Sequence, residues 1–359
     1  MRRKSCLVIG YINMNYGDDL FFDILFKRYK QVDFYFYPPS VLLKKYKNIY
    51  SKYKNVKFYD NEDEYIRIRK DITDENIPIN LFPSILQRAK QVDFYINIGG
   101  SIFIQNQNWK RDDRYEIKNI LGNKPSFIVG CNFGPGDKEY INYLKKWFKN
   151  FDDVCFRDKY SYDMFKKVKS VRYADDIVLS YKKSYKGRKK RSVAVSLISV
   201  NKEYEDGYLN FHAQLIRKFI NINYSINIYV FCYNDNDYNI SLKLLDKLTD
   251  DEIKSINIIK YNGDIDYFYK HFSKNSYLIG SRFHSIIMGI LNRQKILPIS
   301  YGDKTSNYLK DMGYNFDRFF VKNLKNVNAS LEDFKIINHD DNTTGAFDKI
   351  DEYLKRRNK

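Results

Sequence analysis

Short apolar, β-branched runs alternate with helix-like stretches along almost the whole chain of 359 residues. In the first half, strands are expected at residues 6–13, 32–37, 56–59, 93–98, 126–131 and 154–156. Helices are expected between them at residues 18–29, 83–90, 138–149 and 161–168. This strand-helix-strand order predicts a parallel sheet with helices on both faces.

The alternation resumes after a basic stretch at 182–191, which is the best candidate for a linker. Strands are expected at 193–198, 226–232, 256–261, 277–280 and 296–300, and helices at 208–222, 240–248, 265–272, 285–292, 306–312 and 346–356. The prediction is two doubly wound Rossmann-like domains that face a cleft. They comprise residues 1–185 and 186–359, and the terminal helix could pack on either domain. Ligands of such folds bind at the carboxyl ends of the strands, so the cleft is the expected site.

The chain carries 62 Lys and Arg residues against 44 Asp and Glu residues, a formal net charge of +18. Abundant Lys, Asn, Ile, Tyr and Phe are also what an AT-rich genome produces regardless of function. No zinc-finger spacing or RNA-binding signature accompanies the charge, so nucleic acid is not an expected partner. The positive field would instead help to hold anionic substrates or an anionic membrane face.

The four cysteines, Cys6, Cys131, Cys155 and Cys232, form no C-x-x-C pair, and three of them lie in apolar strand-like runs. They are expected to be reduced, buried thiols of a cytosolic protein. No apolar run approaches the ~18–20 residues that a membrane-spanning helix needs. The apolar run behind the basic start is also shorter than a signal-peptide core. A cytoplasmic protein is therefore expected.

Small or glycine-rich loops follow three of the expected strands in the first half. Gly17 permits a tight turn, and Asp18 is placed to cap the next helix, where a phosphate or carboxylate would meet backbone N–H groups. The spacing matches neither a dinucleotide fingerprint nor a P-loop, so NAD and ATP are not indicated. Gly99 and Gly100 would let a ligand approach the backbone, and Ser101 would cap the segment after it. The third loop is residues 131–137. Each loop is also typical of an ordinary turn, but together they indicate a rim around a ligand.

Four side chains carry the expected chemistry. Arg157 ends a strand and suits a bidentate grip on a carboxylate or phosphate, unless it forms a surface pair with Asp158. Arg282 and His284 alternate just before a helix, whose dipole favours the neutral imidazole. Lys304 occupies the next strand-to-helix turn, so adjacent strand ends would bring it near His284. Because no metal-ligand spacing or nucleophile motif is present, these residues predict group transfer without a metal or covalent intermediate.

In order and placement these motifs resemble those of the polysaccharide pyruvyl transferase family, over roughly residues 7–312. The resemblance rests on Asn15-Tyr16-Gly17-Asp18, Gly99-Gly100-Ser101, Gly134-Pro135, Arg157-Asp158-x-x-Ser161, Ala174-Asp175, Ser281-Arg282-Phe283-His284 and Lys304. It implies a fold similar to GT-B glycosyltransferases. It also implies transfer of pyruvate from phosphoenolpyruvate to a sugar as a carboxyethylidene ketal, with loss of phosphate and no further cofactor. The stretch near Cys131 departs from the family, with Cys-Asn where relatives often carry Gln.

In the family, the residues matching Arg157, Arg282, His284 and Lys304 are associated with the donor. We expect His284 to be the acid/base, and Arg157 and Lys304 to hold the carboxylate and phosphate in an unassigned order, with Arg282 as helper or structural partner. The Asn15–Asp18 turn and Gly99–Ser101 would shape the acceptor or donor pocket from the opposite domain, together with Asn132.

The family context implies a capsular, exopolysaccharide or cell-wall glycan acceptor, built on a lipid carrier at the inner face of the cytoplasmic membrane. Peripheral association with anionic lipid would agree with the net charge. Two alternatives remain open. One is a GT-B glycosyltransferase that uses a nucleotide sugar, with Asp264 or Asp266 on the ribose. The other is a non-catalytic protein that binds polyanions or nucleic acid.

Overall fold

A computed structural model of the chain describes residues 2–58, 83–107, 109–111, 113–181, 189–339 and 345–356. The chain divides into two compact units. The first comprises Met1–Ile12, Phe21–Ile177 and Thr344–Lys359, and the second comprises Asn13–Leu20 and Val178–Thr343. The change of unit falls between residues 177 and 178 rather than between the predicted 185 and 186, and a short N-terminal segment also belongs to the second unit. Of the predicted linker at 182–191, residues 182–188 lie outside the described residues.

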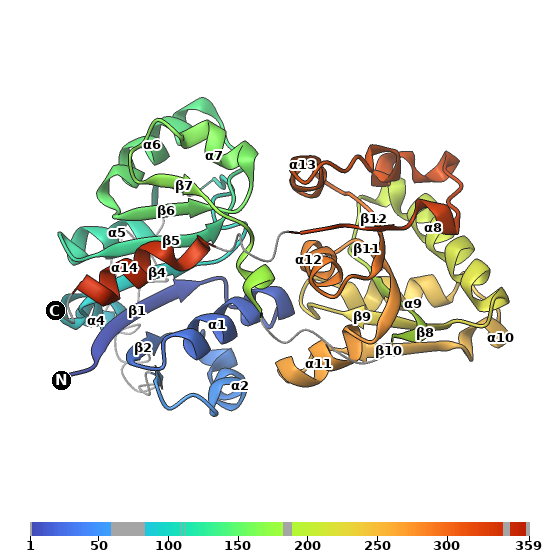
Figure 1. Ribbon diagram of the computed structural model, residues 1–359, viewed down its shortest axis with the longest axis horizontal. Coiled ribbons are helices and arrows are strands. Elements are labelled where there is room, and N and C mark those ends of the chain that lie inside the picture. Colours follow the sequence, from blue (N-terminus) through green and yellow to red (C-terminus); the bar gives the residue numbers. More distant parts are fainter. Residues whose placement is uncertain are drawn as a thin grey trace. The chain divides into compact units, whose positions relative to one another are not determined.

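The first unit is built on a seven-stranded parallel sheet in the order β3-β2-β1-β4-β5-β6-β7 (Figure 1). Its strands are β1 (Lys4–Gly10), β2 (Val32–Phe36), β3 (Val56–Phe58), β4 (Phe94–Ile98), β5 (Ser126–Cys131), β6 (Asp153–Phe156) and β7 (Val171–Tyr173). Its helices are α1 (Tyr16–Arg28), whose first turn groups with the second unit, α2 (Ser40–Tyr50), α4 (Pro83–Gln91), α5 (Asp113–Leu121), α6 (Lys138–Trp147), α7 (Lys159–Phe165) and α14 (Asp348–Arg356).

The second unit has a six-stranded sheet in the order β10-β9-β8-β11-β12-β13, in which only β13 runs antiparallel to its neighbour. Its strands are β8 (Lys190–Ser196), β9 (Ser225–Val230), β10 (Ile256–Lys260), β11 (Asn275–Gly280), β12 (Lys295–Pro298) and β13 (Lys335–Ile336). Its helices are α8 (Lys202–Asn221), α9 (Asp237–Leu245), α10 (Asp250–Ile253), α11 (Ile265–Phe272), α12 (Phe283–Leu291) and α13 (Asp303–Asp311).

Both sheets wind outward from a central pair of strands, β1 and β4 in the first unit and β8 and β11 in the second. This is the doubly wound order of Rossmann folds. Successive strands are added first on one side of the central pair and then on the other. Ligands of such sheets bind beyond the carboxyl ends of that pair. The structure thus confirms the predicted fold class, and it directs attention to the loops after β1, β4, β8 and β11.

Complete burial of β4 and β5 explains why these strands were visible in the sequence. Every residue of β4 and β5 is buried, as expected for parallel strands with both faces covered. The helices that cover them are amphipathic: α6 buries Tyr140, Leu144 and Trp147, which lie three or four residues apart on one face. None of the helices in the described ranges combines the length and apolarity needed to cross a bilayer.

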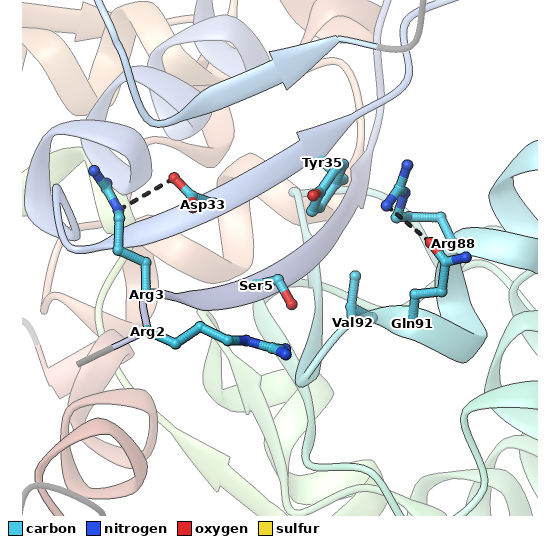
Figure 2. Close-up of a pocket in the computed structure, with 8 residues that line it drawn as sticks. All are labelled: Arg2, Arg3, Ser5, Asp33, Tyr35, Arg88, Gln91 and Val92. Atoms are coloured by element: carbon cyan, nitrogen blue, oxygen red, sulfur yellow. Dashed lines mark hydrogen bonds and ion pairs between the residues drawn. The ribbon is translucent and has the colours of Figure 1, made fainter.

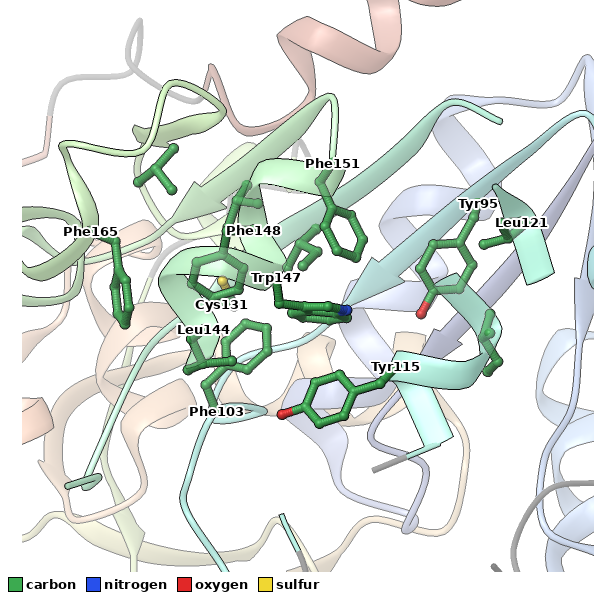
Figure 3. Packing of buried hydrophobic residues seen from close by; sticks show 14 of the residues in the cluster. Tyr95, Phe103, Tyr115, Leu121, Cys131, Leu144, Trp147, Phe148, Phe151 and Phe165 are labelled. Carbon is green, nitrogen blue, oxygen red and sulfur yellow. The ribbon is translucent and has the colours of Figure 1, made fainter. Parts of the chain in front are cut away.

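Aromatic side chains fill the core beneath β5 and β6 (Figure 3). The Trp147 ring lies 4.6 Å from Phe151, 4.9 Å from Tyr115 and 6.1 Å from Phe103, centroid to centroid, in edge-to-face arrangements. Such geometry aligns the positive ring edges with negative ring faces. A tightly packed aromatic core therefore supports β5 and β6, and β6 ends directly before Arg157.

The C-terminal helix α14 belongs to the first unit and lies across the face of its sheet (Figure 1). The ring of Tyr353 packs 5.2 Å from Phe94 on β4 and 5.8 Å from Phe127 on β5. Just before the helix, the Arg172 guanidinium donates hydrogen bonds to the carbonyl oxygens of Gly345 and Ala346 at 2.6 and 2.8 Å. Of the two positions that the sequence left open for this helix, it occupies the one on the N-terminal unit.

All four cysteines are buried and unpaired. Burial raises the pKa of Cys6 and Cys131 well above the ordinary thiol value, and it raises the pKa of Cys155 and Cys232 to about 12. The thiolate form is therefore negligible at neutral pH. The expectation of buried, unpaired thiols is confirmed.

Candidate active site

His284 lies in the first turn of α12, directly after β11, and its ring rests on the backbone of Gly17. A Cβ atom built on Gly17 would lie only 1.8 Å from Nδ1 and 2.2 Å from Cγ of the imidazole. A glycine is therefore required at position 17 because any larger residue would collide with the imidazole, and not because the backbone there adopts an unusual φ. We refer to Asn15, Gly17, Arg282, His284 and Lys304 as the His284 cluster, all of which lie in the second unit.

The segment before α1 is fixed by a helix cap. The Gly17 N–H donates a 3.0 Å hydrogen bond to Oδ1 of Asn15, which stands immediately before the helix. Asn15 therefore occupies the capping position that we predicted for Asp18. Asp18 and Asp19 lie one turn further on, where acidic side chains complement the helix dipole.

Aromatic packing explains why this segment belongs to the second unit and not, as predicted, to the domain opposite His284. The ring of Tyr16 lies 4.5 Å from that of Phe268 on α11, and its N–H donates to the Phe231 carbonyl oxygen at 3.0 Å. The Tyr261 hydroxyl donates a 2.8 Å hydrogen bond to the buried carboxylate of Asp19. The Gly17 contact with His284 is thus built inside one unit.

Arg282 is held by two carboxylates, one in the loop that follows β9 and one at the start of α9. Its Nη1 pairs with Asp235 at 2.9 Å, and its Nε and Nη2 both donate to Asp237. Burial raises the pKa of the Asp237 carboxyl, while Arg282 acts against that shift. For Arg282, burial acts to lower the pKa, but the two carboxylates outweigh it and the pKa is raised. The guanidinium therefore stays protonated, and the two carboxylates fix its orientation.

Lys304 follows β12, which pairs directly with β11, so the structure confirms that Lys304 and His284 follow adjacent strands. Both side chains contact the ring of Phe283. The Lys304 ammonium lies 4.3 Å from the ring centroid, and the His284 ring centroid lies 5.7 Å from it. A cation over an aromatic face is attracted by the ring quadrupole. Phe283 is therefore a common neighbour of the Lys304 ammonium and the His284 imidazole.

A separate group of polar residues surrounds Arg157 in the first unit. Its Nη1 pairs with Asp176 at 2.8 Å, and its Nη2 donates to Oδ1 of Asn132 at 2.8 Å. Ser101 donates to the same Asn132 oxygen at 3.2 Å. Gly100 makes room for the guanidinium, because a Cβ there would lie 2.3 Å from Nη2. The structure thus brings together residues from the loops after β4, β5 and β6.

Arg157 and Asp158 are both buried, so the surface arrangement left open by the sequence is wrong. Asp158 caps α7, accepting hydrogen bonds from the N–H and hydroxyl of Ser161 at 2.7 and 3.0 Å. The Ser161 hydroxyl in turn accepts from the N–H of Phe133 at 2.8 Å. These contacts tie the loops after β5 and β6 together beneath Arg157.

The charges of the site differ from the expectation in one respect. Arg157 and Arg282 were expected to offer cations to an anion, but each is already paired with carboxylate, and Arg157 is only 1% exposed. The partners Asp176, Asp235 and Asp237 were missed. The sequence does place them at strand ends, but which arginine each would meet depends on the strand order.

His212 and His271 make their contacts elsewhere in the second unit. His212 is buried in α8, where its Nδ1–H donates to the Tyr208 carbonyl oxygen at 2.8 Å. His271 lies on α11, with its ring 4.1 Å from that of Tyr267. Among the residues that the structure describes, no group of three His, Cys, Asp or Glu side chains is arranged to hold a metal ion.

Figure 2 shows a pocket of about 420 Å³ in the first unit, lined by Arg2, Arg3, Ser5, Asp33, Tyr35, Arg88, Gln91 and Val92. These residues lie at the amino ends of β1 and β2 and at the end of α4. The loops after β4, β5 and β6, which carry the residues around Arg157, lie at the carboxyl edge of the same parallel sheet. The pocket is thus distinct from the predicted site residues.

Three solved structures share this architecture at low sequence identity. The UDP-GlcNAc 2-epimerase from Methanocaldococcus jannaschii has a TM-score of 0.56 and 10% identity, over 98% of this chain and 99% of that one. The UDP-GlcNAc 2-epimerase from Neisseria meningitidis has a TM-score of 0.54 and 9% identity, over 98% and 100%. A glycosyltransferase from Rickettsia africae has a TM-score of 0.51 and 9% identity, over 90% and 91%. The fold is therefore of the GT-B-like class, and identities this low establish the fold alone.

The model of the family described as polysaccharide pyruvyl transferase matches residues 15–303, well over half of the chain. The chain therefore belongs to the polysaccharide pyruvyl transferase family, as its motifs predicted. No curated protein sequence matches it significantly.

Proposed function

We propose that the protein transfers pyruvate from phosphoenolpyruvate to a sugar of a lipid-linked surface-polysaccharide intermediate, forming a ketal and releasing phosphate. Membership of the family supports polysaccharide pyruvylation in general. The observation that carries the finer proposal is the His284 cluster, in which an imidazole and an ammonium follow adjacent strand ends and contact one ring.

The reaction balances without an oxidant or reductant. One sugar hydroxyl adds to C2 of phosphoenolpyruvate, while the C3 methylene takes up a proton and becomes a methyl group. A second hydroxyl then displaces phosphate from the same carbon. Two carbon–oxygen bonds form, and the bond from C2 to the phosphate oxygen breaks. One hydroxyl proton is balanced by the new methyl group, and the other leaves with phosphate.

In this proposal His284 moves the protons, because an imidazole can both accept a hydroxyl proton and donate one near neutral pH. Lys304 holds an anionic group of the donor. The donor role expected for Arg157 stays a prediction, because its buried guanidinium already pairs with Asp176. Arg282 is a positioning residue, since both of its neighbouring carboxylates already fix its guanidinium. Asn132 and Asp176 likewise fix the plane of the Arg157 guanidinium.

The test is phosphate release from phosphoenolpyruvate with a panel of lipid-linked and synthetic glycosides, with mass spectrometry of the sugar product. His284→Ala should lower kcat by about 10²–10⁴. Its circular dichroism spectrum should match that of the parent, because the half-buried ring rests on a glycine. Near-full turnover by His284→Ala would contradict the proposed mechanism.

Transfer of a sugar from a nucleotide sugar is the second candidate, favoured by the fold shared with a glycosyltransferase. Both carboxylates considered for the ribose have structural partners. Asp264 caps α11 by accepting from the Tyr267 N–H at 2.9 Å, and Asp266 accepts from the Tyr181 hydroxyl at 3.3 Å. Thermal shifts with phosphoenolpyruvate and with a nucleotide-sugar panel separate the two, because a bound ligand stabilises the folded state.

A further inference from the structure

Tyr233 presents an exposed aromatic ring in the loop that follows β9. The residue is 60% exposed, the most of any tyrosine among the described large hydrophobic residues. Its ring is nevertheless braced, because it stacks on Tyr238 at a centroid distance of 5.8 Å with 25° between the planes. The Lys260 ammonium lies 3.5 Å from the centroid of the Tyr238 ring. Tyr233 therefore stands at the outer end of an ordered stack.

The loop that carries Tyr233 is bound to the His284 cluster on two sides. Asp235, two residues on, pairs with Arg282, which directly precedes α12. Asn234 donates a 2.9 Å hydrogen bond to Oδ1 of Asn13, two residues before Asn15. The loop that carries the aromatic ring is thus joined both to the segment before α12 and to the segment before α1, and these two segments position His284.

Exposed amide side chains lie close to Tyr233 in the sequence. Asn234, Asn236 and Asn239 are all exposed, and Asn239 donates a 3.0 Å hydrogen bond to Oδ1 of Asn236. Amides both donate and accept, which matches the hydroxyl groups of a sugar. The electron-rich face of an aromatic ring attracts the weakly positive C–H groups on the apolar face of a pyranose. A single exposed apolar side chain is ordinary, but a braced ring and exposed amides on a loop that is joined to Arg282 have the chemistry of a carbohydrate subsite.

We propose that Tyr233 is the stacking platform for a pyranose ring of the acceptor glycan, with Asn234 and Asn236 recognising its hydroxyl groups. This subsite rests on the proposed function, because that function supplies the carbohydrate acceptor. The subsite is distinct from the residues assigned to the donor. It places the acceptor sugar against the loop whose Asp235 pairs with Arg282.

The experiment compares Tyr233→Ala, Tyr233→Trp and Tyr267→Ala with the parent enzyme. Tyr267 is the matched control, because it is 51% exposed in the same unit but packs its ring against His271. Tyr233→Ala should raise the acceptor KM about ten-fold, with donor KM and kcat within about two-fold. Tyr233→Trp should retain the parent KM, because it keeps an aromatic face, and Tyr267→Ala should leave every constant unchanged.

Direct binding separates failure of the subsite from failure of the proposed function. Saturation-transfer NMR with methyl glycosides of galactose, glucose, mannose and N-acetylglucosamine requires no turnover. We expect at least one glycoside to bind the parent and to lose its signal in Tyr233→Ala. The subsite is overturned if no glycoside binds the parent, if Tyr233→Ala binds equally well, or if Tyr267→Ala is equally impaired. A parent enzyme that binds a glycoside through Tyr233 but releases no phosphate would instead contradict the pyruvyl donor.

Discussion

The imidazole of His284 lies directly against Gly17, at a distance that leaves no room for a Cβ atom on the glycine. The contact joins two segments that are far apart in sequence, the start of α1 and the start of α12. It also makes the position of the ring depend on a residue that has no side chain. A small change at Gly17 should therefore move His284 without touching its chemistry.

Gly17→Ala should displace the imidazole and lower kcat by on the order of 10², because a misplacement of about 1 Å can cost that much in rate. Steady-state phosphate release from phosphoenolpyruvate measures the effect. Gly302→Ala is the control, since a Cβ at Gly302 would meet nothing within 4 Å. Equal activity of Gly17→Ala and the parent would show that the ring position is not important for turnover.

Arg157→Ala should lower stability as well as donor affinity. It leaves the fully buried Asp176 carboxylate without the guanidinium, a change that typically costs about 3–5 kcal/mol. Urea unfolding measures this loss. The double variant Arg157→Met with Asp176→Leu removes both charges and should recover most of the stability.

The same pair of variants separates the structural role of Arg157 from its proposed donor role. If Arg157 holds the donor, the double variant should be folded and still have a raised KM for phosphoenolpyruvate. A stable double variant with the parent KM would restrict Arg157 to structure.

Acid should destabilise the second unit through His212. Burial lowers the pKa of His212 to about 4 from its ordinary value of 6.5, so in that range the unfolded chain binds a proton that the folded chain does not. The free energy of unfolding should therefore fall as the pH drops from about 6.5 towards 4, by on the order of 3 kcal/mol. His212→Asn keeps a side-chain N–H and cannot ionise. Urea unfolding across this range should show a weaker pH dependence for the variant, and identical pH profiles would refute the assignment.

The fold was predictable because strands such as β4 and β5 are buried on both faces and are therefore almost continuously apolar in sequence. Elements with weaker burial were missed. Helix α2 buries only Tyr46 and Tyr50, and β7 and β13 are three and two residues long. Such short or sparsely buried elements carry little periodicity from which to recognise them.

The site was predictable only as a set of residue types at strand ends. The sequence shows that Arg282 follows one strand and that Asp237 follows another. It does not show that β8 alone separates those strands, so that their loops meet. Likewise, the placement of Gly17 beside His284 depends on the packing of Tyr16 among aromatic rings of another segment. Contacts of this kind arise from tertiary structure rather than from local spacing.

The burial of all four thiols makes the native chain a convenient background for site-specific labelling. A maleimide reacts with accessible thiolate, and every native sulfur is both enclosed and held protonated. One cysteine introduced at an exposed position such as Asn239 would then be the preferred target. A fluorophore attached there would report glycan binding beside Tyr233 without removal of any native cysteine.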